Sequence, residues 1–259
     1  MRKIWLKVRI FFWLFLALAG EAQAFDHSHA AFTELLLRHL DAQGLVRYCD
    51  LQKSEPRQQL NRYVTELEKV QLSAYRAWSR SEQMAFLINA YNALTLKLVL
   101  DHYPVPSIKK IGGFFSSPWK LEFFSLLEGR AKALDKIEHE ILRPDFRDYR
   151  IHAAVNCASL SCPPLRREAY TGAKLEAQLD EQMTLWLADP ARNSFDAAKG
   201  QAKISKIFDW YGDDFEKWGQ GLWTVLAKYG PPAAKSLAAG KGRISYLEYD
   251  WNLNEAKDQ

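Results

Sequence analysis

Two of the three cysteines of the chain, Cys157 and Cys162, lie in the stretch IHAAVNCASLSCPPL, which covers residues 151–165. His152 precedes Cys157 by five positions, and two prolines follow Cys162 directly. These residue types fit four kinds of chemistry: a thiolate nucleophile with a histidine base, a disulfide, a metal site, or buried and inert thiols. The rest of the sequence has to favour one of them.

Nucleophilic catalysis requires a thiolate with a lowered pKa and a base within hydrogen-bond reach. Cys157 is the first choice of nucleophile and Cys162 the second, with His152 or His139 as the base. A glutamate or an asparagine would orient that base or bind an oxyanion. The candidate catalytic residues are Cys157, Cys162, His152, His139, Asn89, Asn92 and Glu138.

The segment YRIHAAVN, residues 149–156, has the alternating pattern of a strand. Side chains alternate between the two faces of a strand, so a regular strand would turn His152 and Cys157 away from each other. His152 is therefore a poor base for Cys157 unless the strand bends or the following loop folds back.

A disulfide between Cys157 and Cys162 closes a short loop and would contribute about 2–3 kcal/mol at most. A zinc module needs a further pair of ligands downstream, and none follows the two prolines, so we expect no metal and no cofactor. Because the chain has three cysteines, one thiol stays unpaired in a monomer. Cys49, in a segment predicted to be extended (44–52), is the candidate.

The first 24 residues have the pattern of a cleavable secretory leader. Four basic residues precede or enter an apolar run of 11 residues, and Ala-Gln-Ala places small residues before Phe25. This run is shorter than the roughly 20 residues that span a membrane. We therefore expect cleavage after Ala24, a periplasmic or secreted protein, and no membrane insertion once the leader is removed.

Most of the net positive charge of the chain comes from that leader. Without it, 31 basic and 30 acidic side chains remain, so the mature protein is nearly neutral. Nucleic-acid binding depends on a basic surface, and we expect no nucleic-acid partner.

A long buried helix is predicted from residue 79 to the proline at position 104. Ser79 and Glu82 form a capping box at its start, and Pro104 ends it. Asn89, Asn92 and Thr95 form a polar stripe on this otherwise apolar helix. Buried amides need partners, so they either brace neighbouring backbone or line a site.

The other notable polar and aromatic residues are expected to have structural rather than catalytic roles. Asp135 and Glu138 are expected to cap a short helix that ends at Pro144. The acidic residues Asp209, Asp213 and Asp214 are expected on a solvated helix face or at a cap rather than in a paired-carboxylate site. The seven tryptophans after the leader are expected to pack in the core and at its rim rather than form a sugar-binding platform.

Helical patterns outnumber strand patterns along the chain. The predicted fold is α+β: one helix-rich globular domain, residues 25–259, around a small, mostly antiparallel sheet. Helices are expected at 30–40, 58–70, 79–103, 135–143, 171–189, 205–219 and 221–230. Strands are expected at 119–124, 129–134, 149–156, 201–205 and 242–254.

Several long motifs in this order closely resemble the bacterial members of the family catalogued as domain of unknown function 547. They are FLINAYNALTLKLVLDHYPV, SPWK, IEHEILRP, RIHAAVNCASLSCPPLRREAYT and SKIFDWYGDDF, and the resemblance runs from about Gly44 to Gly230. Leu87 stands where the family often has Trp, and Cys49 where small residues are usual. The resemblance directs attention to Asn89, Asn92, Glu138, His139, His152, Asn156, Cys157 and Cys162, but implies no activity.

A weaker, fold-level likeness connects the buried helix and the histidine-bearing strands with the core of papain-like and transglutaminase-like enzymes. In those families a cysteine opens the helix, and here that helix has no cysteine.

Two functions remain open. The first is a binding or scaffold domain of the cell envelope with buried or bridged cysteines and a small-molecule, peptide or envelope partner. The second is a thiol-dependent hydrolase or acyltransferase that uses Cys157 or Cys162 with His139 or His152.

Overall fold

The computed structural model describes residues 25–113, 116–240 and 242–257. The proposed leader, residues 1–24, lies outside the described residues. Within the described part of the chain, no helix combines the length and apolar character needed to cross a membrane.

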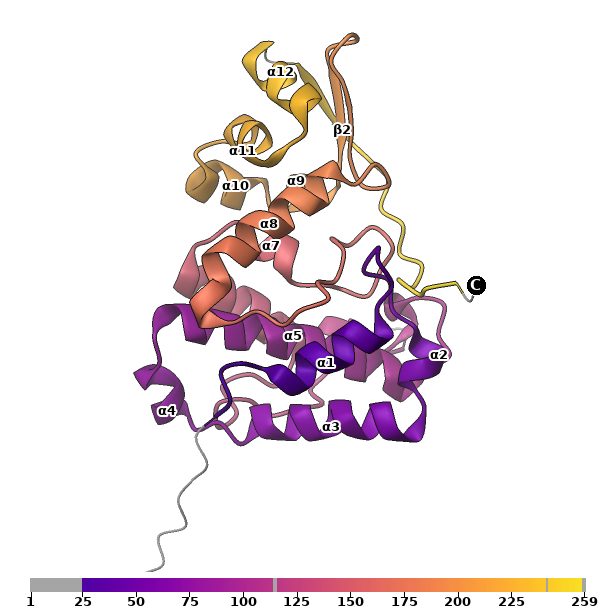
Figure 1. Ribbon diagram of the computed structural model, residues 1–259, viewed down its shortest axis with the longest axis vertical. Coiled ribbons are helices and arrows are strands. Elements are labelled where there is room, and N and C mark those ends of the chain that lie inside the picture. Colours follow the sequence, from indigo (N-terminus) through magenta and orange to yellow (C-terminus); the bar gives the residue numbers. More distant parts are fainter. Residues whose placement is uncertain (1–24, 114–115, 241, 258–259) are drawn as a thin grey trace, which may run out of the picture.

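The first half of the chain forms a layer of helices, in the lower part of Figure 1. Its elements are α1 (Ala30–His39), α2 (Tyr48–Leu51), α3 (Ser54–Glu68), α4 (Leu72–Ala77) and α5 (Arg80–His102). The apolar stripes of α1 and α3 pack together, and α3 also packs on α5. The helices expected at 30–40 and 58–70 are therefore confirmed.

Helix α5 is the central element of this layer. The Ser79 side chain accepts a hydrogen bond from the Glu82 N–H, and the Glu82 carboxylate accepts one from the Ser79 N–H, so the capping box is present. Almost every side chain from Met84 to Leu100 is buried. The helix ends at His102, ahead of the cis Tyr103–Pro104 bond.

Short helical segments connect the two halves of the molecule. They are η1 (Ile108–Lys110), η2 (Pro118–Lys120), α6 (Leu134–Ile137), the π-helical η3 (Glu138–Phe146), α7 (Ile151–Ala154), η4 (Gly172–Lys174) and the longer α8 (Leu175–Ala188). Helix α7 packs on α8, and both lie between the lower and upper parts of the molecule (Figure 1).

The remaining elements form the upper part of the molecule (Figure 1). They are β1 (Ser194–Asp196), β2 (Gln201–Ile204), α9 (Ile207–Trp210), α10 (Gly212–Gly219), α11 (Leu222–Tyr229), α12 (Pro232–Gly240) and β3 (Arg243–Tyr246). Tyr211 separates α9 from α10 in the helix predicted as continuous, and α12 was not predicted.

The three strands form one small sheet in the order β1-β2-β3. β1 and β2 are antiparallel, with Phe195 opposite Ala202, whereas β2 and β3 are parallel, with Ala202 opposite Ile244. Four helices separate β2 from β3, and such a long connection allows parallel pairing. The helix-rich α+β class is confirmed, with a mixed rather than mostly antiparallel sheet.

Two hydrophobic clusters stabilise the described chain. The larger one joins α1, α3 and α5 to the segments around α6 and α7. The smaller one joins α8 to the sheet and to helices α9–α12, and at its centre the Trp186 and Phe208 rings stack with centroids 4.4 Å apart. The boundary between the clusters passes through α7, where Ile151 and Ala154 belong to the larger cluster and Ala153 to the smaller one.

Residues 247–257, here called the C-terminal strap, run from the sheet back to the helical layer (Figure 1). The Leu160 N–H donates to the Asn252 carbonyl at 2.9 Å, and the Val46 N–H donates to the Asn254 carbonyl at 2.9 Å. The strap therefore binds to the loop after α7 and to the segment before α2.

Four predicted extended segments are wrong in whole or in part. Residues 149–156 contain the helical turn α7, in which the Val155 N–H donates to the Ile151 carbonyl. Residues 119 and 120 belong to η2, residues 121–124 have no regular structure, and within 129–134 only Ala131 forms a bridge, to Leu126. Residues 48–51 of the segment 44–52 form α2. A short apolar pattern fits a helical turn or a loop as well as a strand.

Candidate functional site

A cavity of about 300 Å³ lies where the two hydrophobic clusters meet. Its walls come from α5, η2, α6, η3, α7, the loop after α7, α9 and the C-terminal strap. We call it the central pocket. Its aromatic lining consists of Tyr91, Trp119, Trp210, Tyr211, Tyr249 and Trp251.

Five of the seven candidate catalytic residues line the central pocket. They are Glu138, His139, His152, Cys157 and Cys162. Asn89 and Asn92 do not line it; both brace backbone, which was one of the two interpretations of the polar stripe.

Cys157 and Cys162 form a disulfide, with their Cα atoms 6.1 Å apart. The Cys157 N–H donates to Cys162 Sγ at 2.9 Å. The Tyr249 hydroxyl lies 3.1 Å from Cys157 Sγ and accepts a hydrogen bond from Ser159 at 3.0 Å. Of the four interpretations of this stretch, the structure has the disulfide, and neither sulfur is available as a thiolate nucleophile or metal ligand.

Asn92 of α5 positions the segment that leads into the disulfide loop. Its amide donates to the Ala154 carbonyl at 2.9 Å, and its Oδ1 accepts from the Asn156 N–H at 2.8 Å. The Asn156 side chain then donates to the Pro163 carbonyl at 2.8 Å. This chain of buried amides connects α5 with both ends of the disulfide loop.

His152 is buried and forms a hydrogen bond with a carboxylate that the sequence did not predict as buried. Its Nε2 lies 2.8 Å from Oδ2 of Asp214. Burial lowers the pKa of His152, although the Asp214 carboxylate opposes this effect. The ring of His152 also stacks on Tyr211, with centroids 3.9 Å apart.

The Asp214 carboxylate accepts hydrogen bonds from two side chains, His152 and Arg143. Arg143 binds it through two hydrogen bonds, from Nε at 2.7 Å and from a terminal nitrogen at 3.0 Å. Burial alone would raise the pKa of Asp214, but the hydrogen bonds from His152 and Arg143 outweigh burial and lower it to about 2. The expected solvated or capping role of Asp214 is wrong, while Asp209 and Asp213 are exposed and pair with nearby lysines.

Glu138 is not the helix cap that the sequence predicted. The α6 helix begins at Leu134 rather than after Asp135, so Glu138 lies at the start of the π-helical η3, with only 6% of its surface exposed. Its Oε1 accepts a hydrogen bond from the Tyr211 hydroxyl at 2.7 Å. Pro144 does not end this helix, which continues to Phe146.

His139 lies at the edge of the same network. Its Nδ1 is 3.1 Å from Arg143, and its Nε2 is 3.6 Å from the Asp135 carboxylate. Both histidine rings stack near the Tyr211 ring, with a centroid distance of 3.9 Å for His152 and 6.1 Å for His139. Tyr211 connects the two histidines and Glu138 in one cluster.

The aromatic wall of the central pocket was not predicted from the sequence. Trp210, Tyr249 and Trp251 pack against one another, with centroids 4.4–5.8 Å apart, and Trp119 meets Trp251 at 5.6 Å. Trp210 remains 47% exposed. The number of tryptophans and the motif SKIFDWYGDDF, which contains Trp210, were the sequence signals, but neither indicated a shared wall because these residues lie far apart in the chain.

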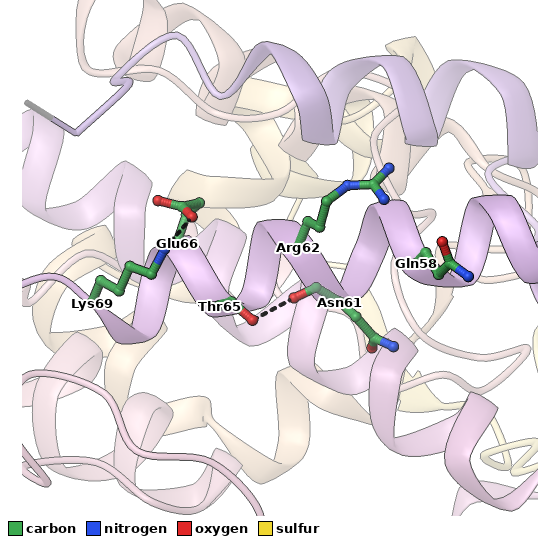
Figure 2. Close-up of a pocket in the computed structure, with 6 residues that line it drawn as sticks. All are labelled: Gln58, Asn61, Arg62, Thr65, Glu66 and Lys69. Carbon is green, nitrogen blue, oxygen red and sulfur yellow. Dashed lines mark hydrogen bonds and ion pairs between the residues drawn. The ribbon is translucent and has the colours of Figure 1, made fainter. Parts of the chain in front are cut away.

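A second hollow, of about 480 Å³, lies along α3 (Figure 2). All six of its lining residues belong to this one helix or to its C-terminal end, and they include the ion pair between Lys69 and Glu66 at 2.7 Å. Its lining has no aromatic or buried ionisable side chain. It is a solvated helix face rather than a candidate site.

The fold and the central pocket define a helix-rich α+β protein with an aromatic, acidic pocket between two hydrophobic clusters. Residues 75–187 match the model of a family described as "Protein of unknown function, DUF547". The chain therefore contains a DUF547 segment, and the resemblance stated from its motifs is confirmed over these residues. No curated protein and no solved structure gives a significant match.

Proposed function

We propose that the protein is an exported binding domain of the cell envelope, which takes a small molecule or the end of a peptide into the central pocket. The leader pattern of residues 1–24 supports export. The observation that carries binding is the pocket itself, because concave sites with aromatic walls and a few convergent polar groups are typical of ligand binding.

The disulfide supports binding over thiol catalysis. A thiol-dependent hydrolase needs a free thiolate, and both sulfurs of the predicted nucleophile stretch are bonded to each other. The bridge instead fixes one wall of the pocket, while Asn92 and Asn156 hold the backbone on either side of it. A wall fixed in this way lowers the entropy cost of ordering the site around a ligand.

The test is a fragment screen by ligand-observed NMR on the protein without its leader, repeated on Trp210→Ala. Trp210 is half-exposed, so its truncation should leave the fold intact while it removes one wall of the pocket. We expect fragments that bind the wild type to lose about tenfold or more in affinity, since an aromatic anchor at a binding site contributes about 1–2 kcal/mol or more.

The matched control is Trp218→Ala, in α10, because this residue does not line the pocket. It should bind every fragment as the wild type does. If the fragments bind Trp210→Ala unchanged, or if the wild type binds none, the proposed function is wrong.

A further inference from the structure

We infer that the central pocket is selective for a ligand with a substituted ammonium group; this inference rests on the proposed binding function. The argument starts from the two buried carboxylates of the site. Asp214 has its charge compensated by Arg143 and faces His152. Glu138 has two hydroxyl partners, Tyr211 and Tyr91, but no ion pair with a lysine, arginine or histidine among the described residues.

The cationic groups around Glu138 are already engaged elsewhere. Arg143 and His152 are close enough for the Glu138 charge to raise their pKa values, but both donate to Asp214. His139 interacts with Arg143 and Asp135. A buried carboxylate without a cationic partner is costly, and a cationic ligand would supply the missing charge.

The other faces of the pocket have the chemistry that binds cations. The rings of Trp210, Tyr249 and Trp251 are inclined to one another by 24–48°, and Trp119 is inclined to Trp251 by 65°. These rings form one wall of the pocket, and aromatic faces at a cavity attract a cation through their negative π surfaces, as in the sites that recognise ammonium groups. Lys109 already lies 4.8 Å from the centre of the Trp251 ring.

The lining also disfavours other ligand classes. Neither lysine nor arginine occurs among the described residues that line the pocket, whereas Asp135 and Glu138 do. An anionic ligand would meet two carboxylates and neither of these cations there. A neutral ligand would cover the aromatic faces but leave the Glu138 charge uncompensated.

The probe pair for the test is choline and its uncharged isostere 3,3-dimethylbutan-1-ol, titrated by calorimetry into the protein without its leader. We expect choline to bind about tenfold or more tightly than the alcohol, since a desolvated cation–π contact and one carboxylate act on the cation alone. Nα-acetyl-lysine amide, titrated in parallel, distinguishes a free cation from a lysine side chain of a peptide. Binding of either cation above the alcohol supports the inference.

Glu138→Gln removes the charge of this side chain but keeps its hydrogen bond, because the amide oxygen can still accept from the Tyr211 hydroxyl. We expect this variant to lose the part of the choline preference that the carboxylate supplies, while a smaller preference from the aromatic rings remains. A Glu138→Gln variant with the full wild-type preference would contradict the role of this carboxylate. The matched control is Asp209→Asn, which removes one exposed carboxylate outside the pocket and should keep the wild-type preference.

The outcomes separate this inference from the proposed function. If choline, the lysine derivative and the alcohol bind equally and all weaken in Trp210→Ala, the pocket binds ligands but the cation preference is wrong. The cation preference is also wrong if only neutral or anionic fragments bind the pocket. If no probe and no fragment binds, both proposals fail.

Discussion

Glu138 and Asp214 illustrate how side chains of one type acquire different roles through their contacts. Asp214 receives hydrogen bonds from Arg143 and His152, which hold its pKa at about 2. It therefore stays ionised and positions the buried His152 ring. Glu138 has only hydroxyl partners and no cation paired with it in the described part of the chain, and it lines the central pocket, so its charge is available to a ligand.

Cys49 and the bridged pair Cys157–Cys162 differ in reactivity, and this difference can be measured. Cys49 is exposed and free, with Sγ 3.0 Å from the Tyr103 hydroxyl. When protein from the exported fraction is denatured and alkylated without reductant, we expect one added alkyl group, on Cys49. After reduction, we expect three.

Mass spectrometry gives this count, and the intact mass also shows whether the chain begins at Phe25. Labelling of Cys157 without reductant would contradict the Cys157–Cys162 disulfide and would support the hypothesis of thiol catalysis. A chain that retains residues 1–24 would contradict the predicted cleavage.

At the scale of elements, α5 supports two different segments through two similar asparagines. Asn89 holds the backbone of Tyr170 through two hydrogen bonds, of 2.7 and 2.9 Å. Asn92 holds the segment that enters the disulfide loop in the same manner. Only the second segment borders the central pocket, so the two residues form a matched pair.

We expect Asn92→Ala and Asn89→Ala each to lower the free energy of unfolding by about 2–4 kcal/mol, because each leaves two buried backbone groups unpaired. Only Asn92→Ala should also weaken ligand binding, since it frees one wall of the pocket. Urea denaturation and calorimetric titration measure the two effects.

Asn61→Ala, on the exposed face of α3, should change stability by less than about 0.5 kcal/mol. Equal loss of binding in both buried variants would show that the effect is general destabilisation rather than release of the disulfide loop.

The elements that could be predicted were those with strong local signals. The capping box at Ser79 and a long apolar pattern define α5, and the stripe that includes Leu179 and Trp186 defines α8. Residues 149–156 gave the wrong answer because a short alternating pattern does not fix a strand without a partner. Here the segment packs on α8 and is hydrogen-bonded to Asn92, and its backbone forms the helical turn α7.

The candidate site could be predicted only in part, for the same reason. His139, His152 and the two cysteines stood out by residue type and lie at the central pocket. Asp214 looked like one of several surface acids, and nothing local marked Trp210 or Trp251. The two tryptophans line the pocket only because α9, the C-terminal strap and η3, which are far apart in the sequence, pack close together in the fold. No local sequence pattern specifies such packing.

At the scale of the whole molecule, two buried histidines lie in different regions and affect stability with the same sign. His29, with Nδ1 2.7 Å from the Tyr63 hydroxyl, precedes α1, and burial lowers its pKa to about 4. Burial also lowers the pKa of His152, at the boundary of the clusters. In the unfolded chain both histidines titrate near pH 6.5.

Because the unfolded chain takes up protons that the folded protein does not, the stability contributed by both histidines is complete above about pH 6.5 and is lost as the pH falls below it. We expect His29 to account for a loss on the order of 2–3 kcal/mol between pH 6.5 and pH 4. Urea denaturation at a series of pH values measures it.

His29→Asn, which suits the left-handed backbone at this position, should reduce the pH dependence by that amount. His27→Asn, at a partly exposed neighbour, is the control and should keep the wild-type profile. If His29→Asn has the wild-type profile, burial of His29 does not affect stability in this pH range. Below pH 4, protonation of Asp214 removes a further contribution, because its folded pKa lies near 2.

The central pocket crosses the boundary of the segment that matches DUF547. Glu138, His152 and the disulfide lie inside residues 75–187, whereas Trp210, Tyr211 and the aromatic residues of the C-terminal strap lie outside it. Tyr91 and Trp119 also lie inside the segment, so only part of the aromatic wall lies outside it. Substitutions of Trp210, Tyr249 or Trp251 can alter which ligand fits while Tyr211 and Asp214 still hold Glu138 and His152. Two chains that share this segment therefore need not share a ligand.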